Sequence, residues 1–367
     1  MSDTPALLKR RIAALEEANN QLLAKFVRKP THSYRLEGRA IRWLVDLAKP
    51  ISDLIAEHDC RLELGAEDEA SADAIEGSTE EEYTYRSFKK LVHWCPSIKK
   101  ILGLDAGNHD MVLVSQELRK GADGARGDDA NALKTAVMNW LNETSSHPEP
   151  LLSPTDKSKR GFYNDVTGQL LCPVDYDWCD AFIQSAIHEY HPKYPVTAHT
   201  YPAFVYLKGQ YDPINPSKGI FKGELLVRAF CSIFTSPSSA QAELDNEDTV
   251  GSSRKAQKVA RGARTHCDVA GLLKMRSVDP HAIAYTTCQL RFALSSSTSW
   301  NLHNEEFDYN GLYRNITDYF EQPLSPKKST EVKELLLWWN RKVFGHRNAS
   351  FYQPQHVETL SVALARR

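Results

Sequence analysis

Residues 279–294, DPHAIAYTTCQLRFAL, constrain the fold more than any other stretch of this chain. Asp279 is a good helix N-cap, and Pro280 suits the first helical position, where a missing N–H costs nothing. Apolar residues then recur at helical spacing, and alanines among them let neighbouring elements approach closely. The serine-rich run 295–299 ends the pattern, because hydroxyl side chains compete for the backbone. We therefore predict a buried helix, with the apolar block 335–344 as its partner.

The rest of the chain repeats helical spacing, whereas the alternation typical of strands is nearly absent. Helices are expected over residues 37–59, with a kink or break near Pro50, and over 83–104. Two more helices are expected at 110–120 and 130–142, separated by a glycine- and aspartate-rich breaker at 121–129. The later helices are expected at 223–235, 304–321 and 331–344. The sequence thus predicts a mainly α protein, with a multi-helix globular domain and long proline-rich loops.

The N-terminal segment 5–28 carries a heptad pattern. Its apolar residues alternate spacings of four and three, with one asparagine at an a position, as in parallel two-stranded coiled coils. An amphipathic helix lying on its own domain is the alternative, because about three heptads are close to the shortest stable coiled coil. We predict a homodimer formed through the a and d residues Leu8, Ile12, Leu15, Asn19, Leu22 and Phe26.

Shifts in composition divide the chain into parts. Residues 63–82 hold nine carboxylates, no basic residue and few large apolar ones, which indicates a solvated linker. An acidic contact for a basic partner is the alternative for this stretch. A polar, proline-containing stretch near residue 150 marks a second boundary. The predicted parts are a coiled-coil helix at 1–29, an N-terminal helical region at 30–150, a C-terminal α-rich domain at 151–345 and a polar tail at 346–367.

The formal net charge of −2 gives the whole chain no strong attraction to nucleic acid or to membrane. No run approaches the roughly 18 apolar residues of a membrane helix. The N-terminus has no apolar signal-peptide core, so we expect an intracellular protein, nuclear or cytoplasmic. The seven cysteines are scattered without a CxxC pair, which indicates free thiols in a reducing compartment.

A basic segment follows an acidic run in the second half of the chain. Arg254, Lys258, Arg261 and Arg264 fall on one helical face, and Lys255 adds a fifth positive charge without any acid between them. Such a face can track a phosphate backbone and gain affinity by releasing counterions. A solvated loop, pairing with the preceding acidic run, and a nuclear-import signal are the other interpretations. Nucleic acid is therefore one candidate partner.

Three histidines, His188, His191 and His199, raise the question of a metal site. A zinc-protease helix needs two histidines at i and i+4, because these share one face. Here the first two are spaced i and i+3, and Pro192 ends any helix at once. We therefore predict no metal ligand, and we keep an enzyme site near His188–His199 as an alternative function.

Two further groups of residues combine side chains that can carry chemistry. His266, Cys267 and Asp268 place a thiol beside a base and an acid, but neighbouring side chains in a turn point apart. No catalytic residue and no cofactor are therefore predicted. Trp338 and Trp339 stand among leucines, where adjacent tryptophans commonly divide between a core and an interface; a ligand pocket with Trp300 and Arg291 is the alternative.

Five blocks between about residues 160 and 345 occur in a fixed order. They are GQLLCPVDYDW, YLKGQYDPINPSKGIFKGELLV, IFTSPSSA, DPHAIAYTTCQLRFALSSSTSW and LLLWWNRKVFG. In this order they resemble an uncharacterised domain family found in large numbers in mushroom-forming fungi. The resemblance implies a fungal intracellular protein with a single α-rich module. It assigns no activity, cofactor or catalytic residue to any position.

These patterns together favour a non-enzymatic interaction protein. It would be dimeric through residues 5–28, and its C-terminal α domain would bind a partner, with nucleic acid on residues 254–264 as one candidate. The alternative is an enzyme of unknown class, with a site assembled near His188–His199 from residues distant in the sequence.

Overall fold

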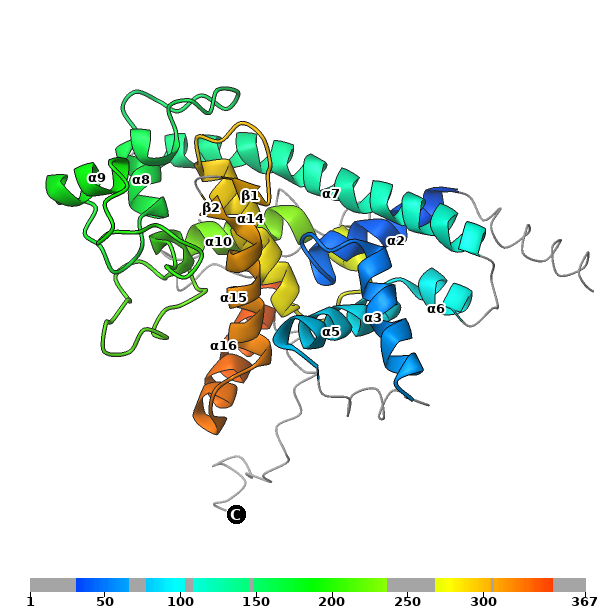
Figure 1. Cartoon of the computed structure of the whole chain (residues 1–367). Helices are drawn as coiled ribbons and strands as arrows, with labels where there is room; N and C mark the ends of the chain where they lie inside the picture. The colour runs from blue at the N-terminus through cyan, green and yellow to red at the C-terminus, as the bar shows by residue number, and fades with distance from the viewer. Residues whose placement is uncertain are drawn as a thin grey trace, which may run out of the picture. The chain divides into compact units, whose positions relative to one another are not determined.

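The computed structural model describes residues 31–65, 77–102, 108–144, 148–235, 268–304 and 307–345, and these are mainly helical (Figure 1). The strands among them are β1 (His303–Asn304) and β2 (Phe307–Asp308). The mainly α class predicted from the sequence is confirmed. Contacts divide the chain into a first unit, up to Trp140 with residues 300–304, and a second unit, which holds the rest. The predicted coiled-coil residues Leu8 to Phe26 lie outside the described residues.

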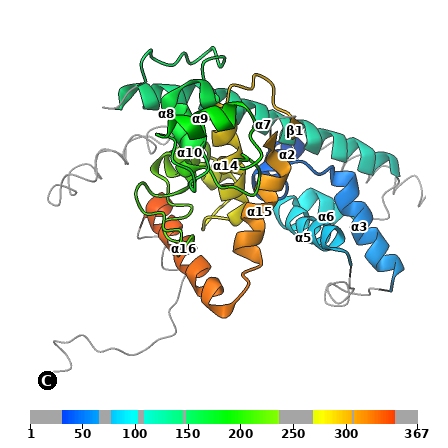
Figure 2. The same cartoon turned by 60° about the vertical axis from the view of Figure 1, so that its left-hand side comes forward.

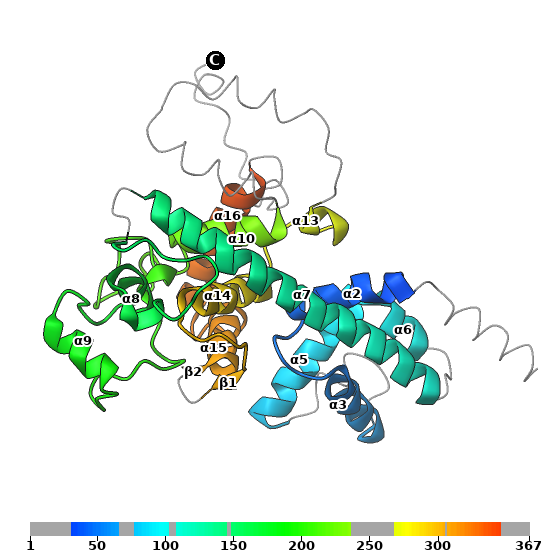
Figure 3. The same cartoon turned by 90° about the horizontal axis from the view of Figure 1, so that it is seen from above.

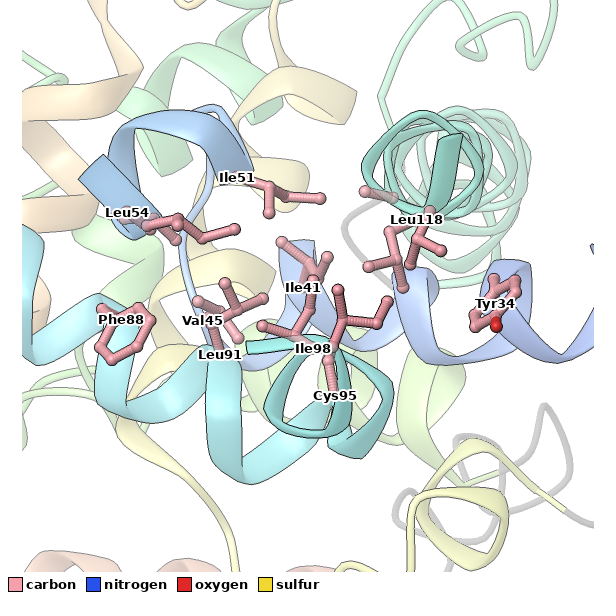
Figure 4. Close-up of a cluster of buried hydrophobic side chains, with 14 of the residues drawn as sticks. Tyr34, Ile41, Val45, Ile51, Leu54, Phe88, Leu91, Cys95, Ile98 and Leu118 are labelled. Carbon is pink, nitrogen blue, oxygen red and sulfur yellow. The ribbon is translucent and has the colours of Figure 1, made fainter. Parts of the chain in front are cut away.

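The first unit is built around one apolar core. The helices are α2 (Thr31–Leu44), α3 (Ile51–Glu63), α5 (Thr79–Trp94), α6 (Pro96–Leu102) and α7 (Asn108–Glu143), whose last residues belong to the second unit. Ile41 of α2, Leu91 of α5 and Leu118 of α7 are fully buried and point into a common cluster (Figure 4). Each such side chain contributes about 1.5–3 kcal/mol by leaving water.

Helices α2 and α7 approach closely because each presents a glycine to the other (Figure 3). A Cβ atom added to Gly38 would lie 2.1 Å from the carbonyl oxygen of Leu118. One added to Gly121 would lie 2.2 Å from the carbonyl oxygen of Arg35. The predicted breaker at 121–129 is therefore wrong, because these residues continue α7. A glycine inside a helix costs only about 1 kcal/mol, which close packing against a second helix can offset.

The aspartates of the same stretch also contact α2. Asp128 accepts a hydrogen bond from Arg39 at 2.9 Å, and Asp129 accepts one from the indole N–H of Trp43 at 2.7 Å. These carboxylates therefore face cations and donors of the neighbouring helix. From the sequence alone, Asp128 and Asp129 were predicted to belong to a breaker between helices.

The turns between the first helices are held by side-chain caps. Between α2 and α3, the buried carboxylate of Asp46 accepts from the backbone N–H groups of Ala48 and Lys49 and from the hydroxyl of Tyr83. The predicted interruption near Pro50 is confirmed. Helix α5 begins with a capping box between Ser78 and Glu81, so the last residues of the acidic stretch 63–82 are helical.

The second unit surrounds α14 (Pro280–Leu294), which is buried along almost its whole length. Asp279 caps it by accepting from the backbone N–H of His281 at 2.8 Å, and Pro280 occupies its first turn, both as predicted. The elements around it are η1 (Gly161–Tyr163), α8 (Asp165–Leu171), α9 (Ala181–His188), η2 (Ala203–Val205), α10 (Glu224–Phe234), α13 (Val269–Leu272), α15 (Tyr309–Glu321) and α16 (Pro326–Phe344).

The main partner of α14 is α15, which lies along it in Figures 1 and 2. The buried imidazole of His281 links the two helices, since its Nδ1 lies 2.8 Å from the hydroxyl of Tyr313 and its Nε2 lies 2.9 Å from the carboxylate of Glu321. The second partner is α10. The expectation that residues 335–344 would be the chief partner of α14 is therefore not met.

The block 335–344 instead contacts α10 through one of its tryptophans. Trp339 of α16 is fully buried, and its ring centroid lies 5.1 Å from that of Phe230. Trp338 is half-buried beneath the ammonium of Lys222. The adjacent tryptophans thus divide between a core and an outer position. The guanidinium of Arg291 lies 3.2 Å from the ring centroid of Phe307.

Gln289 of α14 is fully buried, and neither its amide oxygen nor its amide nitrogen has a hydrogen-bond partner among the described residues. A buried unsatisfied amide costs about 1–3 kcal/mol, whereas an apolar side chain of similar size avoids this cost. We therefore expect Gln289→Leu to raise the free energy of unfolding by about 1–3 kcal/mol, measured by urea denaturation. Gln289→Glu, which buries a charge at the same place, should lower it. A loss of stability in Gln289→Leu would show that the amide is bonded in solution, for example to an internal water.

Within the described residues, no helix is both long enough and apolar enough to span a lipid bilayer.

Candidate functional site

A candidate site in the second unit is a pocket between the loop 149–159, the start of α8, and α9. Figure 2 labels these two helices. The loop forms the first wall, and hydrogen bonds within the loop hold its backbone in place. The hydroxyl of Ser153 accepts from the N–H groups of Thr155 and Asp156, and the carboxylate of Asp156 accepts from the N–H and hydroxyl of Ser158. Two hydrogen bonds from Ser158 lower the pKa of Asp156, and the one from its backbone N–H has the larger effect. The loop therefore keeps a defined shape at neutral pH.

Two buried cations attach this loop to the end of α14. The ammonium of Lys157 donates to the carbonyl of Phe292 at 2.6 Å, and the guanidinium of Arg160 donates to the carbonyl of Ala293 at 2.8 Å. Carbonyls in the last turn of a helix lack partners within the helix, and positive charge is favourable there. Burial lowers the pKa of Arg160 to about 10, so the side chain is still charged at neutral pH. The loop is thus fixed to the most buried helix of the unit.

Gly161 turns the chain from the anchored loop into the pocket. Its φ of +69° lies in the left-handed region that glycine adopts without strain, and a Cβ atom there would lie 3.1 Å from the backbone nitrogen of Ser296. Phe162 and Tyr163 follow in η1 and line the pocket. Asn164 then caps α8 by accepting from the N–H groups of residues 166 and 167. Close packing of the turn therefore fixes the backbone that carries both rings.

The opposite wall is made by Trp178 and α9. A Cβ atom on Gly168 would lie 2.3 Å from the indole ring of Trp178, so the glycine is what lets the indole pack against α8. The amide of Gln184 donates to the carbonyl of Trp178 at 2.8 Å, and Asp180 caps α9. These contacts fix the turn before α9 and the indole that it carries.

The cavity has a volume of about 620 Å³. Aromatic rings form one continuous side: ring centroids are 5.5 Å apart for Phe162 and Trp178, 6.4 Å for Trp178 and His188, and 5.7 Å for His188 and Tyr163. The full lining consists of Glu149, Pro150, Leu151, Leu152, Ser153, Asp156, Lys159, Phe162, Tyr163, Asn164, Asp165, Trp178, Gln184 and His188. Such a mixture of apolar surface and a few polar groups is typical of ligand sites.

Trp178 combines burial with an unsatisfied donor. Its side chain is 6% exposed, and its indole N–H has no hydrogen-bond partner among the described residues. A buried indole N–H usually finds a partner, because leaving it without one costs free energy. Trp178 therefore keeps an unsatisfied, covered donor beside the pocket.

Exposed aromatic side chains continue beyond the pocket. Tyr163 in the lining is 71% exposed, and Phe182 and Tyr190, which do not line it, are 58% and 76% exposed. Tyr190 follows α9 with a φ of +54°, where glycine would be less strained, while the N–H of His191 bonds to the carbonyl of Ala186. The protein thus holds a large exposed ring at a position that favours glycine. Local strain of this kind is often found at functional sites.

The three histidines His188, His191 and His199 have different neighbours. His188 lines the pocket, the ring of His191 lies 5.9 Å from that of Tyr194, and Nδ1 of His199 lies 3.2 Å from the side-chain amide of Asn315. Among the described residues, no group of three or more histidine, cysteine or acidic side chains could hold a metal ion. Of the sequence-predicted enzyme region, only the end of α9 reaches the cavity.

The other residues singled out from the sequence have different positions. The basic face Arg254, Lys255, Lys258, Arg261 and Arg264 lies outside the described residues, as do His266 and Cys267. Asp268 caps α13 by accepting from the N–H of Gly271 at 2.7 Å. Burial raises the pKa values of Cys95, Cys172 and Cys288, which are therefore protonated at neutral pH.

Sequence reasoning missed the residues that build the pocket. Phe162, Tyr163 and Trp178 stand in one short stretch that is rich in aromatic residues, FYNDVTGQLLCPVDYDW, and this density was the available signal. Lys157 and Arg160 resembled ordinary loop cations. Their burial depends on the C-terminus of α14, more than 130 residues away in the chain.

The comparisons with known proteins place the chain in a family. The sequence model described as "Family of unknown function (DUF6698)" matches residues 120–344, more than half of the chain, and the protein belongs to this family. The resemblance of residues 160–345 to an uncharacterised domain family is thus confirmed. No curated protein and no solved structure matches the chain. The whole pocket lies within the matched residues.

Proposed function

We propose that this protein acts by binding a partner molecule, and that the ring-lined pocket of the second unit is its binding site. The observation that carries this proposal is the row of aromatic rings along one side of the cavity, in which the 71% exposed ring of Tyr163 lies 5.7 Å from that of His188. Binding sites combine concave apolar surface with a few polar groups that orient the ligand. Here the rings supply the apolar surface, and polar residues of the lining such as Lys159 and Gln184 supply the polar groups.

Parts of the proposal rest on sequence pattern alone. They are a homodimer through the heptad residues Leu8 to Phe26, nucleic acid as a candidate partner of the basic face 254–264, and a fungal protein of the nucleus or cytoplasm. A dimer would present two copies of the pocket and so raise the affinity for a repeated ligand.

An enzyme with a site near His188–His199 has less support. The three imidazoles contact different neighbours, and only His188 lines the cavity. General acid–base catalysis needs a second reacting group within hydrogen-bond reach. No hydrogen bond from His188 to such a group is present among the described residues.

The binding proposal predicts that small aromatic fragments bind this pocket. We would measure saturation-transfer NMR with cationic, neutral and anionic aromatic fragments on the full chain. At least one class should bind, and Tyr163→Ala should weaken that binding about fivefold to tenfold, since an aromatic contact contributes about 1 kcal/mol or more. Phe182→Ala is the matched control, because this ring is also exposed but does not line the cavity.

Two results would contradict the binding proposal. One is that no fragment of any charge class binds. The other is that binding persists unchanged in Tyr163→Ala, which would place it elsewhere on the protein. Circular dichroism and thermal melting of each variant check that the fold is retained.

A further inference from the structure

We propose that Ser325 is a phosphorylation site for a proline-directed protein kinase. The serine stands between α15 and α16 (Figure 1) and does not line the pocket, so the proposal does not depend on the binding function. In the reaction, Oγ of Ser325 forms a bond to the γ-phosphorus of magnesium-bound ATP, and ADP leaves with the electron pair of the broken bond. The hydroxyl proton passes to a carboxylate of the kinase.

The residues that follow Ser325 match what such kinases select. Four serine or threonine residues of the chain precede a proline: Thr4, Ser153, Ser236 and Ser325. A proline after the modified residue has no N–H that the kinase would have to satisfy. Kinases also select substrates by the charges around the target, and a basic residue three positions after it is one such preference. Among the four, only Ser325 is followed by a base there, which is Lys328.

The structure leaves this serine open to an enzyme. Residues 324–327 are all exposed, and the side chain of Leu324 is 99% exposed. The backbone of Ser325 has a φ of −157° and a ψ of 159°, which is an extended conformation. Its hydroxyl accepts a hydrogen bond from the backbone N–H of Lys328 at 3.2 Å. The serine therefore lies on an exposed turn that a kinase can approach.

The first turn of α16 has to open when a kinase binds the residues after the serine in extended form. Terminal turns of helices fray readily. None of the residues 326–331 is buried, and Val332 is the first residue of α16 that belongs to the core. Opening separates the ammonium of Lys328 from Ser217 and Glu331, but it exposes no core side chain. The fold therefore opposes the reaction with a few surface hydrogen bonds.

The phosphate is favourable in the place where the reaction puts it. Ser325 is the N-cap of α16, a helix of 19 residues, and a phosphate there accepts hydrogen bonds from N–H groups of the first turn and meets the positive end of the helix dipole. Lys327 and Lys328 add positive charge beside it. The nearest acid along the helix, Glu331, is already paired with Lys328 at 2.8 Å. Modification should therefore stabilise the start of α16.

Ser153 provides a contrast in the same unit, because it is also exposed and also precedes a proline. Its hydroxyl accepts from the N–H groups of Thr155 and Asp156 at 3.2 and 3.0 Å, and its carbonyl accepts from the guanidinium of Arg160 at 2.8 Å. The third residue after it is the acidic Asp156, which would repel a phosphate. A proline-directed kinase should therefore leave Ser153 unmodified.

The full chain, incubated with magnesium-bound ATP and a cyclin-dependent kinase, tests the proposal, with the modified residue assigned by mass spectrometry. Ser325 should be modified about tenfold faster than Ser153. Pro326→Ala should lower the rate at Ser325 about tenfold, because alanine returns the N–H and still suits a helix. Lys333→Ala is the matched control: it changes an exposed residue of the same helix outside the recognised positions, so the rate should change less than about twofold.

A thermal melt tests where the phosphate lies. The phosphorylated chain should melt about 2 °C higher than the unmodified chain at low salt, because a helix N-terminus favours negative charge. Phosphatase treatment should reverse the shift, and high salt should reduce it. A lower melting temperature after modification overturns the placement of the phosphate on the N-terminus of α16.

A synthetic peptide of residues 318–332 shows what each failure means. If the kinase modifies the peptide and leaves Ser325 of the folded chain untouched, the fold shields the serine and the proposal is wrong. If it does not modify the peptide either, the residues after Ser325 are not recognised, and the proposal is wrong for that reason. Equal rates at Ser153 and Ser325 overturn the selection argued from structure and charge. None of these outcomes affects the fragment-binding test of the pocket.

Discussion

Replacing Gly121 by alanine is expected to lower the free energy of unfolding by about 3 kcal/mol, although the change adds one methyl group and improves helix propensity. The new Cβ atom would lie 2.2 Å from the carbonyl oxygen of Arg35, on the backbone of α2. Backbone cannot rotate away as a side chain can, so the two helices must separate. Separation would also loosen Leu118 and Ile41, which are fully buried in the core shared by these helices.

Gly124→Ala provides the matched control on the same helix. Gly124 is exposed, and a Cβ atom there would meet nothing within 4 Å. Without a clash, only the better helix propensity of alanine acts, so this change should stabilise the protein by about 1 kcal/mol. Urea denaturation followed by circular dichroism measures both variants. Equal effects of the two substitutions would show that α2 and α7 do not approach each other in solution as described.

Arg160→Leu is expected to lower the free energy of unfolding by about 4 kcal/mol, because it takes the guanidinium donor away from one buried and two part-buried carbonyl groups. The guanidinium donates to the carbonyls of Ser153, Pro154 and Ala293 at distances between 2.8 and 3.0 Å. Leucine fills part of the volume but donates nothing. The loss also removes positive charge from the C-terminus of α14, where it is favourable.

The loop 149–159 should become mobile in the same variant, because it loses an anchor to α14. Hydrogen exchange measured by mass spectrometry should therefore accelerate in this loop, and fragment binding in the pocket should weaken. Lys159→Leu is the control: it removes a positive charge from the same loop, but Lys159 is exposed, so the unfolding midpoint should not move measurably. If Arg160→Leu is as stable as the native chain, the loop is not held by this side chain.

Local chemistry explains why some elements could be predicted from the sequence. Asp279 and Pro280 start α14, and Ser295 follows its last residue, because caps and backbone preferences act within one helical turn. The helical class follows in the same way from apolar residues spaced at three and four. Such signals lie within a few residues of the structure that they specify.

The stretch 121–129 shows where local reasoning fails. Glycine and aspartate disfavour helix by intrinsic preference, yet these residues lie inside α7. Gly121 allows contact with the backbone of α2, and Asp128 and Asp129 bond to Arg39 and Trp43. These partners are more than 80 residues away, so a local window could not reveal them. Long-range packing outweighed a preference of about 1 kcal/mol per residue.

The candidate site could also be predicted only in part from the sequence. The sequence drew attention to His188 because of its residue type, and the aromatic density around Trp178 was visible without being read as a site. The cavity exists because Lys157 and Arg160 bind the last carbonyls of α14 and because Gly168 admits the indole of Trp178. The sequence by itself determined the helices and several of their ends, since these depend on neighbouring residues. Only the tertiary structure decided which helices touch, which cations are buried and where the pocket lies, because those depend on contacts between residues distant in the chain.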